Sequence, residues 1–217
     1  MPGTFYLIRH GESASNAGEK TTDAGSTTLT ERGWQAARAN AATFPHKPDR
    51  VITSRYIRTA QTAEPFLARF QGVPVEEWDI HEFTYMSAEK YAGTTTHDRR
   101  PHIDVYWKKG DPHFADGDAE SFAQFAARCH AAIARMAQSE GITVAFTHGH
   151  MIRGILHALR GNFDAITPAA METFWRDHHA NPIANCARFV FDVPGDGRVI
   201  YCERQECQPD DQNPQVD

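Results

Sequence analysis

The chain has 217 residues, of which 41% are hydrophobic, so it is long enough for one sizeable α/β domain with at most an inserted cap. Its formal net charge is -6 with the histidines counted as neutral, which excludes the basic surface that nucleic-acid binding needs. The four cysteines form no CxxC pair. The first residues lack the charged region and the apolar region of a signal peptide, and no apolar run reaches the length of a membrane span. We therefore expect a cytoplasmic protein with no nucleic-acid or membrane partner. These features leave the oligomeric state open.

Strand and helix patterns alternate along the first part of the chain. An apolar run at 5–10 predicts a buried strand, and the small polar residues at 13–28 predict a loop. Thr28 followed by Glu31 resembles a capping box, so a helix is expected from there until Pro45. The next predicted elements are a strand at 51–53, a helix at 56–70 and a strand at 73–78.

The pattern dissolves between 83 and 117, where glycine, proline, aromatic and paired basic residues mix. A structureless loop of this length is uncommon in a compact domain, so we expect a lid or cap with short helices. Asp118 is the predicted N-cap of the following helix. The last predicted elements are a strand at 142–147, a helix at 151–159 and a hairpin of 189–191 with 199–201. A single domain over 1–207 and a disordered acidic tail at 208–217 complete the prediction.

This alternation predicts an α/β fold, a three-layer α/β/α sandwich around a mostly parallel sheet. Two strand ends in it carry the residues that suggest chemistry, namely Arg9-His10-Gly11 and His148-Gly149. Open α/β sheets bind ligands at the carboxyl ends of their strands, and glycine lets the backbone come close to a ligand. Either histidine alone is explained by burial, but the pair predicts two imidazoles over one pocket. The neighbouring arginine favours an anion, above all a phosphate.

The chemistry of phosphate suggests roles for these and other polar residues. A neutral imidazole attacks phosphorus if its other ring nitrogen donates to a carbonyl group, and an arginine grips phosphate oxygens with two hydrogen bonds. Arg55 and Arg58 lie in the first turn of a helix that points at the strand ends, and their spacing does not choose between them. Turn formation explains Ser13 and Asn16 equally well, and Glu82 by itself reads as a solvated carboxylate.

Together, these motifs resemble the histidine phosphatase superfamily, the phosphoglycerate mutase-like enzymes. The matching residues occur in the family's order and are Arg9-His10-Gly11-Glu12-Ser13 with Asn16, Leu29-Thr30-Glu31-Arg32-Gly33, Thr53-Ser54 through Arg58, Gln61-Thr62-Ala63, Glu82, and His148-Gly149 with Ile152-Arg153. The resemblance implies a phosphoglycerate mutase-like sandwich that needs no metal or other cofactor. It also implies a small-molecule phosphoester as the substrate.

The resemblance further implies roles for individual residues. It makes His10 the nucleophile that becomes phosphohistidine, and it selects Arg58 over Arg55. Glu82 is then the proton donor to the leaving group, with a pKa expected to be raised by partial burial near the phosphate. The other implied catalytic residues are Arg9 and an imidazolium at His148, and the implied substrate contacts are Ser13, Asn16, Gly149 and His150.

The predicted function is hydrolysis of a phosphomonoester, and other functions stay open. A cofactor-dependent phosphoglycerate mutase uses the same residues, although its characteristic insertion does not match residues 83–117. A phosphate-binding protein without turnover is a second alternative. A metallohydrolase is a third, but the histidines show no metal-ligand spacing, and His178 and His179 are expected to be surface residues. Substrate specificity is expected in the lid, from Phe83, Tyr85, Tyr91, Tyr106, Trp107, Arg99, Arg100, Lys108 and Lys109.

Overall fold

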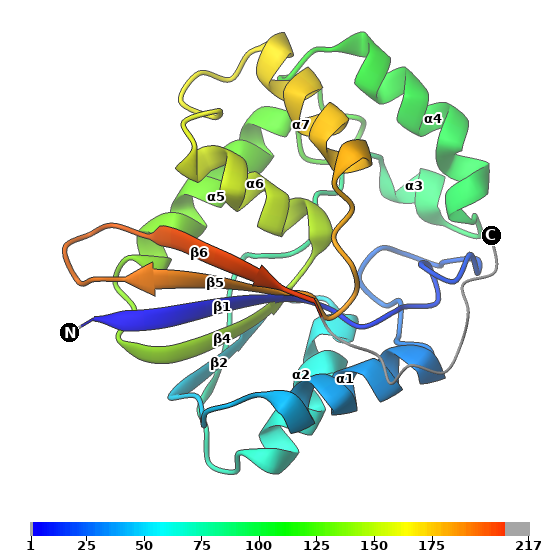
Figure 1. Cartoon of the computed structure of the whole chain (residues 1–217). Helices are drawn as coiled ribbons and strands as arrows, with labels where there is room; N and C mark the ends of the chain where they lie inside the picture. Colours follow the sequence, from blue (N-terminus) through cyan, green and yellow to red (C-terminus); the bar gives the residue numbers. More distant parts are fainter. Residues whose placement is uncertain (1, 207–217) are drawn as a thin grey trace.

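The computed structural model describes residues 2–206, and a six-stranded sheet forms its centre (Figure 1). The predicted tail at 208–217 lies outside the described residues. The strands, in the spatial order β3-β2-β4-β1-β5-β6, are β1 (Gly3–Arg9), β2 (Arg50–Thr53), β3 (Val75–Glu77), β4 (Gly141–Thr147), β5 (Arg188–Val193) and β6 (Ile200–Gln205). The helices are α1 (Glu31–Thr43), α2 (Ile57–Arg69), α3 (Ala88–Tyr91), α4 (Thr96–Lys109), α5 (Phe122–Met136), α6 (Gly149–Leu159) and α7 (Pro168–Ala180). None of these helices is long and apolar enough to cross a membrane.

The register of the central strands brings two strand ends together. β1 pairs in parallel with β4, and Arg9 lies opposite Thr147 at the end of the ladder. The next residues, His10 and His148, therefore leave the sheet side by side. β5 runs antiparallel to β1 and pairs with β6 as the predicted hairpin, so the sheet is mixed while strands β1 to β4 are parallel.

Side chains of β1 alternate between two cores, as expected for a strand buried on both faces. Phe5 and Leu7 belong to the cluster under α5 and α6, whereas Tyr6 and Ile8 belong to the cluster under α1 and α2. Figure 1 shows these helix pairs on opposite faces of the sheet. The predicted three-layer α/β/α sandwich is confirmed.

Several predicted element boundaries are wrong. The N-cap of α1 is Thr30 rather than Thr28, because its side chain accepts from the N–H three residues on. Ser121, not Asp118, caps α5 through a reciprocal capping box, and the Asp118 carboxylate accepts from the N–H of Ala88 instead. β3 spans only three residues. Helix α7 was not predicted, although Thr167 before a proline at the first helical position is a start signal.

The segment 83–117 contains α3 and α4, which lie beyond the carboxyl ends of the strands (Figure 1). The expectation that its aromatic residues form an accessible surface is wrong for four of them, while the role of the segment in substrate specificity stays a prediction. Tyr106 and Trp107 are buried and pack with Phe83 and Tyr85 in the main core, since a short segment can stay folded only by burying apolar area. Among the basic residues of this segment, Arg99 is buried, with only 3% of its surface exposed.

Arg99 joins the lid to the loop at 13–28. Its Nη1 donates to Thr21 Oγ1 at 2.9 Å and to the carbonyl oxygen of Thr94 at 2.9 Å. The backbones of these two threonines also form a β-bridge. The loop at 13–28 and the segment 83–117 are thus held together by a buried cation with neutral acceptors.

Candidate active site

The rings of His10 and His148 face one another at the carboxyl ends of β1 and β4. Their centroids are 5.0 Å apart with 59° between the ring planes. His10 is 3% exposed and His148 is fully buried. The two strand-end histidines thus lie together as predicted, because β1 and β4 are adjacent and in register. That they share a substrate pocket stays a prediction.

His10 has the tautomer that a nucleophile requires. Its Nδ1 lies 2.7 Å from the carbonyl oxygen of Gly11, which can only accept, so Nδ1 carries the hydrogen and Nε2 keeps its lone pair. Arg58 Nε donates to Nε2 at 3.1 Å. Burial, together with the charges of Arg58 and Arg9, holds the pKa of His10 well below its ordinary value. The ring is therefore neutral at neutral pH.

His148 is tied into the site from both nitrogens. Arg58 Nη2 lies 3.1 Å from Nδ1, and because a guanidinium can only donate, Nδ1 accepts and Nε2 carries the hydrogen. That nitrogen lies 2.8 Å from Ser54 Oγ, to which it donates. Burial and the Arg58 charge hold the pKa of His148 well below its ordinary value, so the predicted imidazolium is a neutral imidazole in this structure.

The structure distinguishes the two arginines that spacing could not. Arg58 is 7% exposed and bonds both histidines, while its Nη1 donates to the Ala24 carbonyl oxygen at 2.6 Å. Arg55 faces away: its side chain is 57% exposed, and its nearest polar partners are His81 and, at 3.7 Å, Asp79. Arg55 precedes α2, whose N-cap is Tyr56, whereas Arg58 lies in the first turn of that helix, so only Arg58 contacts the two histidines.

Arg9 supplies a second, half-buried cation at the end of β1. One of its terminal nitrogens donates to the Ile183 carbonyl oxygen. Its Nε is buried and has no hydrogen-bond partner within residues 2–206. Gly149, the first residue of α6, lies against this guanidinium, since a Cβ there would be 3.6 Å from Nε. The unpaired N–H and the positive N-terminal end of α6 together favour an anion here.

Glu82 approaches the cations from the segment after β3. Its Oε1 accepts from the N–H groups of Phe83 at 3.1 Å and His150 at 3.0 Å. Burial opposes ionisation, but the neighbouring His150 side chain and the Arg58 charge outweigh it and hold the pKa of Glu82 well below its ordinary value. The expected rise in this pKa is therefore wrong for the residues by themselves, because the cations around the carboxylate favour its charged form.

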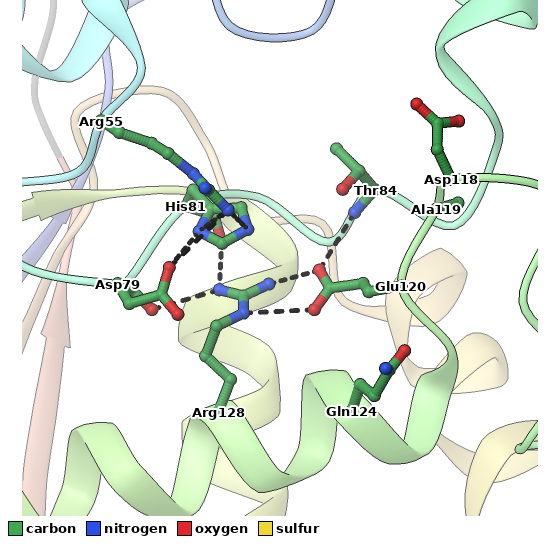
Figure 2. Close-up of a pocket in the computed structure, with 9 residues that line it drawn as sticks. All are labelled: Arg55, Asp79, His81, Thr84, Asp118, Ala119, Glu120, Gln124 and Arg128. Atoms are coloured by element: carbon green, nitrogen blue, oxygen red, sulfur yellow. Dashed lines mark hydrogen bonds and ion pairs between the residues drawn. The ribbon is translucent and has the colours of Figure 1, made fainter.

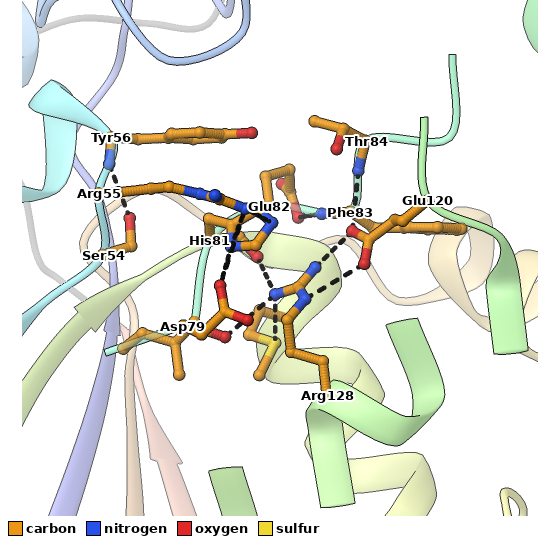
Figure 3. A network of polar contacts seen from close by, with 12 residues as sticks. Ser54, Arg55, Tyr56, Asp79, His81, Glu82, Phe83, Thr84, Glu120 and Arg128 are labelled. Carbon is orange, nitrogen blue, oxygen red and sulfur yellow. Dashed lines mark hydrogen bonds and ion pairs between the residues drawn. The ribbon is translucent and has the colours of Figure 1, made fainter. Parts of the chain in front are cut away.

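A buried ion pair fixes the backbone that carries Glu82 (Figure 3). Arg128 pairs with Glu120 and donates to the His81 carbonyl oxygen at 2.7 Å, and Glu120 accepts from the Thr84 N–H at 3.3 Å. The same residues line a polar pocket of about 400 Å³ together with Arg55 and Asp79 (Figure 2). Sequence reasoning missed Arg128 because nothing in a helix pattern shows which loop its side chain will reach.

Ser13 and Asn16 bond chiefly to one another. Asn16 Oδ1 accepts from Ser13 N at 3.2 Å and from Ser13 Oγ at 3.1 Å, which is turn chemistry. Asn185 joins this turn to His10, since its Nδ2 lies 3.3 Å from Asn16 Oδ1 and 2.9 Å from the His10 carbonyl oxygen. Asn185 was missed because it is an ordinary loop asparagine in a distant part of the chain. The predicted contact of Ser13 and Asn16 with substrate stays a prediction.

Close backbone packing sets the position of the loop after His10. A Cβ on Gly33 would lie 2.1 Å from the carbonyl oxygen of Glu12, and one on Gly11 would lie 2.6 Å from the carbonyl oxygen of Gly33. Only glycine allows this approach of the α1 start to the strand end. Within residues 2–206, no group of three or more histidine, cysteine, aspartate or glutamate side chains is arranged to hold a metal ion.

Two neutral histidines, two guanidiniums and a carboxylate thus converge at the sheet edge, an arrangement suited to binding a dianion and attacking it. The sequence profile of the Histidine phosphatase superfamily (branch 1) matches residues 5–200, and the chain belongs to this family. No curated protein matches the sequence significantly.

Solved structures of phosphatases share the fold at low sequence identity. A phosphoserine phosphatase from Entamoeba histolytica, in complex with 3-phosphoglyceric acid, has a TM-score of 0.70 and 19% identity over 95% of this chain and 98% of its own. An alpha-ribazole phosphatase from Shigella flexneri has a TM-score of 0.70 and 19% identity over 92% of this chain and 94% of its own. A mycobacterial glucosyl-3-phosphoglycerate phosphatase, solved with VO3, has a TM-score of 0.65 and 22% identity over 87% of this chain and 92% of its own.

Proposed function

We propose that the protein is a phosphomonoesterase that hydrolyses a small phosphorylated substrate through a phosphohistidine at His10. The observation that carries this proposal is the hydrogen bonding of His10, whose Nδ1 is tied to the Gly11 carbonyl oxygen. The lone pair on Nε2 then faces Arg58, and the ring of His148 lies across the same space. A neutral nucleophile beside buried cations is what attack on a phosphate dianion needs.

The phosphate is bound by Arg9 and Arg58, whose two charges match those of the dianion. Without substrate, Arg58 donates to His10 and His148. Phosphate oxygens that enter between the two rings accept these Arg58 N–H groups instead, which frees the lone pair on His10 Nε2. The bound dianion offsets the charge of Arg58, which raises the pKa of His148 and favours its imidazolium form. His10 attacks in line with the leaving alkoxide.

Glu82 acts as the acid and then as the base. An alkoxide leaves poorly without a proton, so Glu82 donates one as the P–O bond breaks. The carboxylate that results then takes a proton from the water that hydrolyses the phosphohistidine. Because the dianion neutralises the cations around Glu82, substrate binding raises the low pKa of this carboxyl toward the range in which it can carry a proton.

Labelling and substitution of the nucleophile test the proposal. His10→Ala should lose several orders of magnitude in phosphatase turnover, as the loss of a nucleophile does, whereas substitution of the exposed His46 by alanine should change little. Rapid quenching of the parent should find acid-labile phosphate on His10. Near-normal turnover in His10→Ala would overturn the mechanism.

The choice of acceptor and substrate needs separate assays. Water-directed hydrolysis measured beside 2,3-bisphosphoglycerate-dependent mutase turnover separates a phosphatase from a mutase, and we expect hydrolysis to dominate. The names of the similar structures suggest a first panel of α-ribazole phosphate, phosphoserine and glucosyl-3-phosphoglycerate. Binding of phosphate without turnover on any ester would instead favour a phosphate-binding protein.

A further inference from the structure

The proposed mechanism leaves the source of one proton open. Glu82 has to carry a proton when the leaving group departs, yet its surroundings in the structure keep the pKa of this carboxyl well below its ordinary value. In later turnovers the attacking water restores the proton, but the first one has to be supplied when the substrate binds. A titratable group beside the carboxylate is the simplest source.

His150 is positioned to be that group. Its backbone N–H donates to Glu82 Oε1 at 3.0 Å, and its ring Nδ1 lies 3.5 Å from the same oxygen. Among residues 2–206, His150 is the one residue whose side chain forms an ion pair with Glu82. The backbone bond holds the α-carbon of His150 beside the carboxylate, within reach of its ring.

The ring of His150 has no competing partner for its protons. The side chain is 13% exposed, and neither ring nitrogen makes a hydrogen bond within the described residues. Its neighbours are the rings of Phe83, Tyr85 and Phe174, which accept no strong hydrogen bond at these centroid distances of about 6 Å. A buried nitrogen in this position has Glu82 as its nearest charged acceptor.

A stack of rings holds His150 in place from the side of α7. His178 lies against it with the centroids 4.5 Å apart, Trp175 stacks on His178 at 5.2 Å, and Trp107 of the lid stacks on Trp175 at 4.3 Å. Burial and the proximity of His150 and Arg153 lower the pKa of His178 to about 3, so His178 is neutral and does not compete for the proton. The expectation that His178 is an ordinary surface histidine is wrong.

We propose that His150 is the proton partner of Glu82, supplying the proton that the carboxylate passes to the leaving group. This inference rests on the proposed function. When the dianion binds, the Nδ1–H bond of an imidazolium at His150 breaks, an O–H bond forms on Glu82, and the electron pair stays on Nδ1. Glu82 gives the proton to the alkoxide, later takes one from water, and returns it to His150 when phosphate leaves. The titratable and charged groups around the pair are Tyr56, Tyr85, His148, His178, Arg9, Arg58 and Arg153.

Two substitutions at His150 and one control test the inference. His150→Asn keeps a polar side chain that cannot carry a proton, and His150→Phe keeps the ring stack, so one variant serves if the other fails to fold. His178→Phe keeps the stack and leaves Glu82 untouched. Single-turnover phosphorylation is measured with glycerol phosphate, whose alkoxide needs a proton, and with p-nitrophenyl phosphate, whose nitrophenolate does not.

Both His150 variants should slow phosphorylation by glycerol phosphate about tenfold or more relative to p-nitrophenyl phosphate, a loss within the range of general acid catalysis. His178→Phe should leave this ratio at the parent value. Equal losses on the two substrates, or a change in KM alone, would make His150 a substrate contact and overturn the inference. If the parent hydrolyses neither ester and forms no phosphohistidine, the proposed function itself has failed.

Discussion

Removal of the Arg58 side chain is the sharpest test of the proposed pocket. Arg58→Ala deletes the group that contacts both histidines, at 3.1 Å in each case, and that is held from behind by the Ala24 carbonyl oxygen. The two N–H groups that point at the rings are the ones available to a phosphate between them. Binding and turnover should both fall, because the same bonds serve the substrate and the transition state.

The magnitude follows from those two hydrogen bonds. Each bond to a charged group contributes about 1.5–3 kcal/mol, so the loss of two costs about 3–6 kcal/mol, or roughly 10²- to 10⁴-fold in kcat/KM. A second effect follows from charge. Arg58 helps to depress the pKa of His10, so its removal raises that pKa and moves the acid limb of the kcat/KM profile to higher pH.

Arg55→Ala is the matched control, since this arginine lies three residues earlier, just before α2, and its side chain is 57% exposed. It should cost less than about 1 kcal/mol, as exposed ion pairs usually do. The assay is kcat/KM on p-nitrophenyl phosphate across pH, with orthovanadate inhibition as a measure of binding and thermal unfolding as a check on the fold. Equal or greater damage from Arg55→Ala would refute the assignment of the pocket to Arg58.

Three further predictions concern the acid, the stability and the backbone. Glu82→Gln should slow single-turnover phosphorylation by glycerol phosphate strongly and by p-nitrophenyl phosphate much less, and equal losses would mean that Glu82 is not the acid. The free energy of unfolding, measured with urea between pH 7.5 and 5, should decrease as the pH is lowered below about 6.5. The reason is that the buried histidines have lowered pKa values in the folded protein and bind protons only after unfolding. Since the pKa of His178 is lowered to about 3, His178→Phe should remove about 1.4 kcal/mol per pH unit from that slope, and an unchanged slope would contradict the burial of this ring. Gly33→Ala should destabilise the fold by about 1–3 kcal/mol or more and reduce turnover, since its Cβ would overlap the Glu12 carbonyl oxygen, and a fully stable, active variant would show that this contact relaxes freely.

The sequence by itself determined the elements and the chemistry at the strand ends. Apolar runs, cap residues and prolines act within a few residues, so the parallel core strands, the helices around them and the final hairpin could be predicted from local pattern. The pairing of His10 with His148 followed too, because two strand-end His-Gly pairs in one parallel sheet meet at one edge. The family model confirms the resemblance that these motifs carry.

Only the tertiary structure decided which side chains face one another and what charge they carry. Arg58 and Arg55 differ in surroundings rather than in local sequence, and Asn185 reaches the nucleophile across most of the chain. The unpredicted helix α7 places the half-buried ring of His178 against His150, and the cations that meet around Glu82 invert the expected direction of its pKa shift. Burial and Coulomb interactions depend on distances between segments far apart in the chain, so no local pattern encodes them.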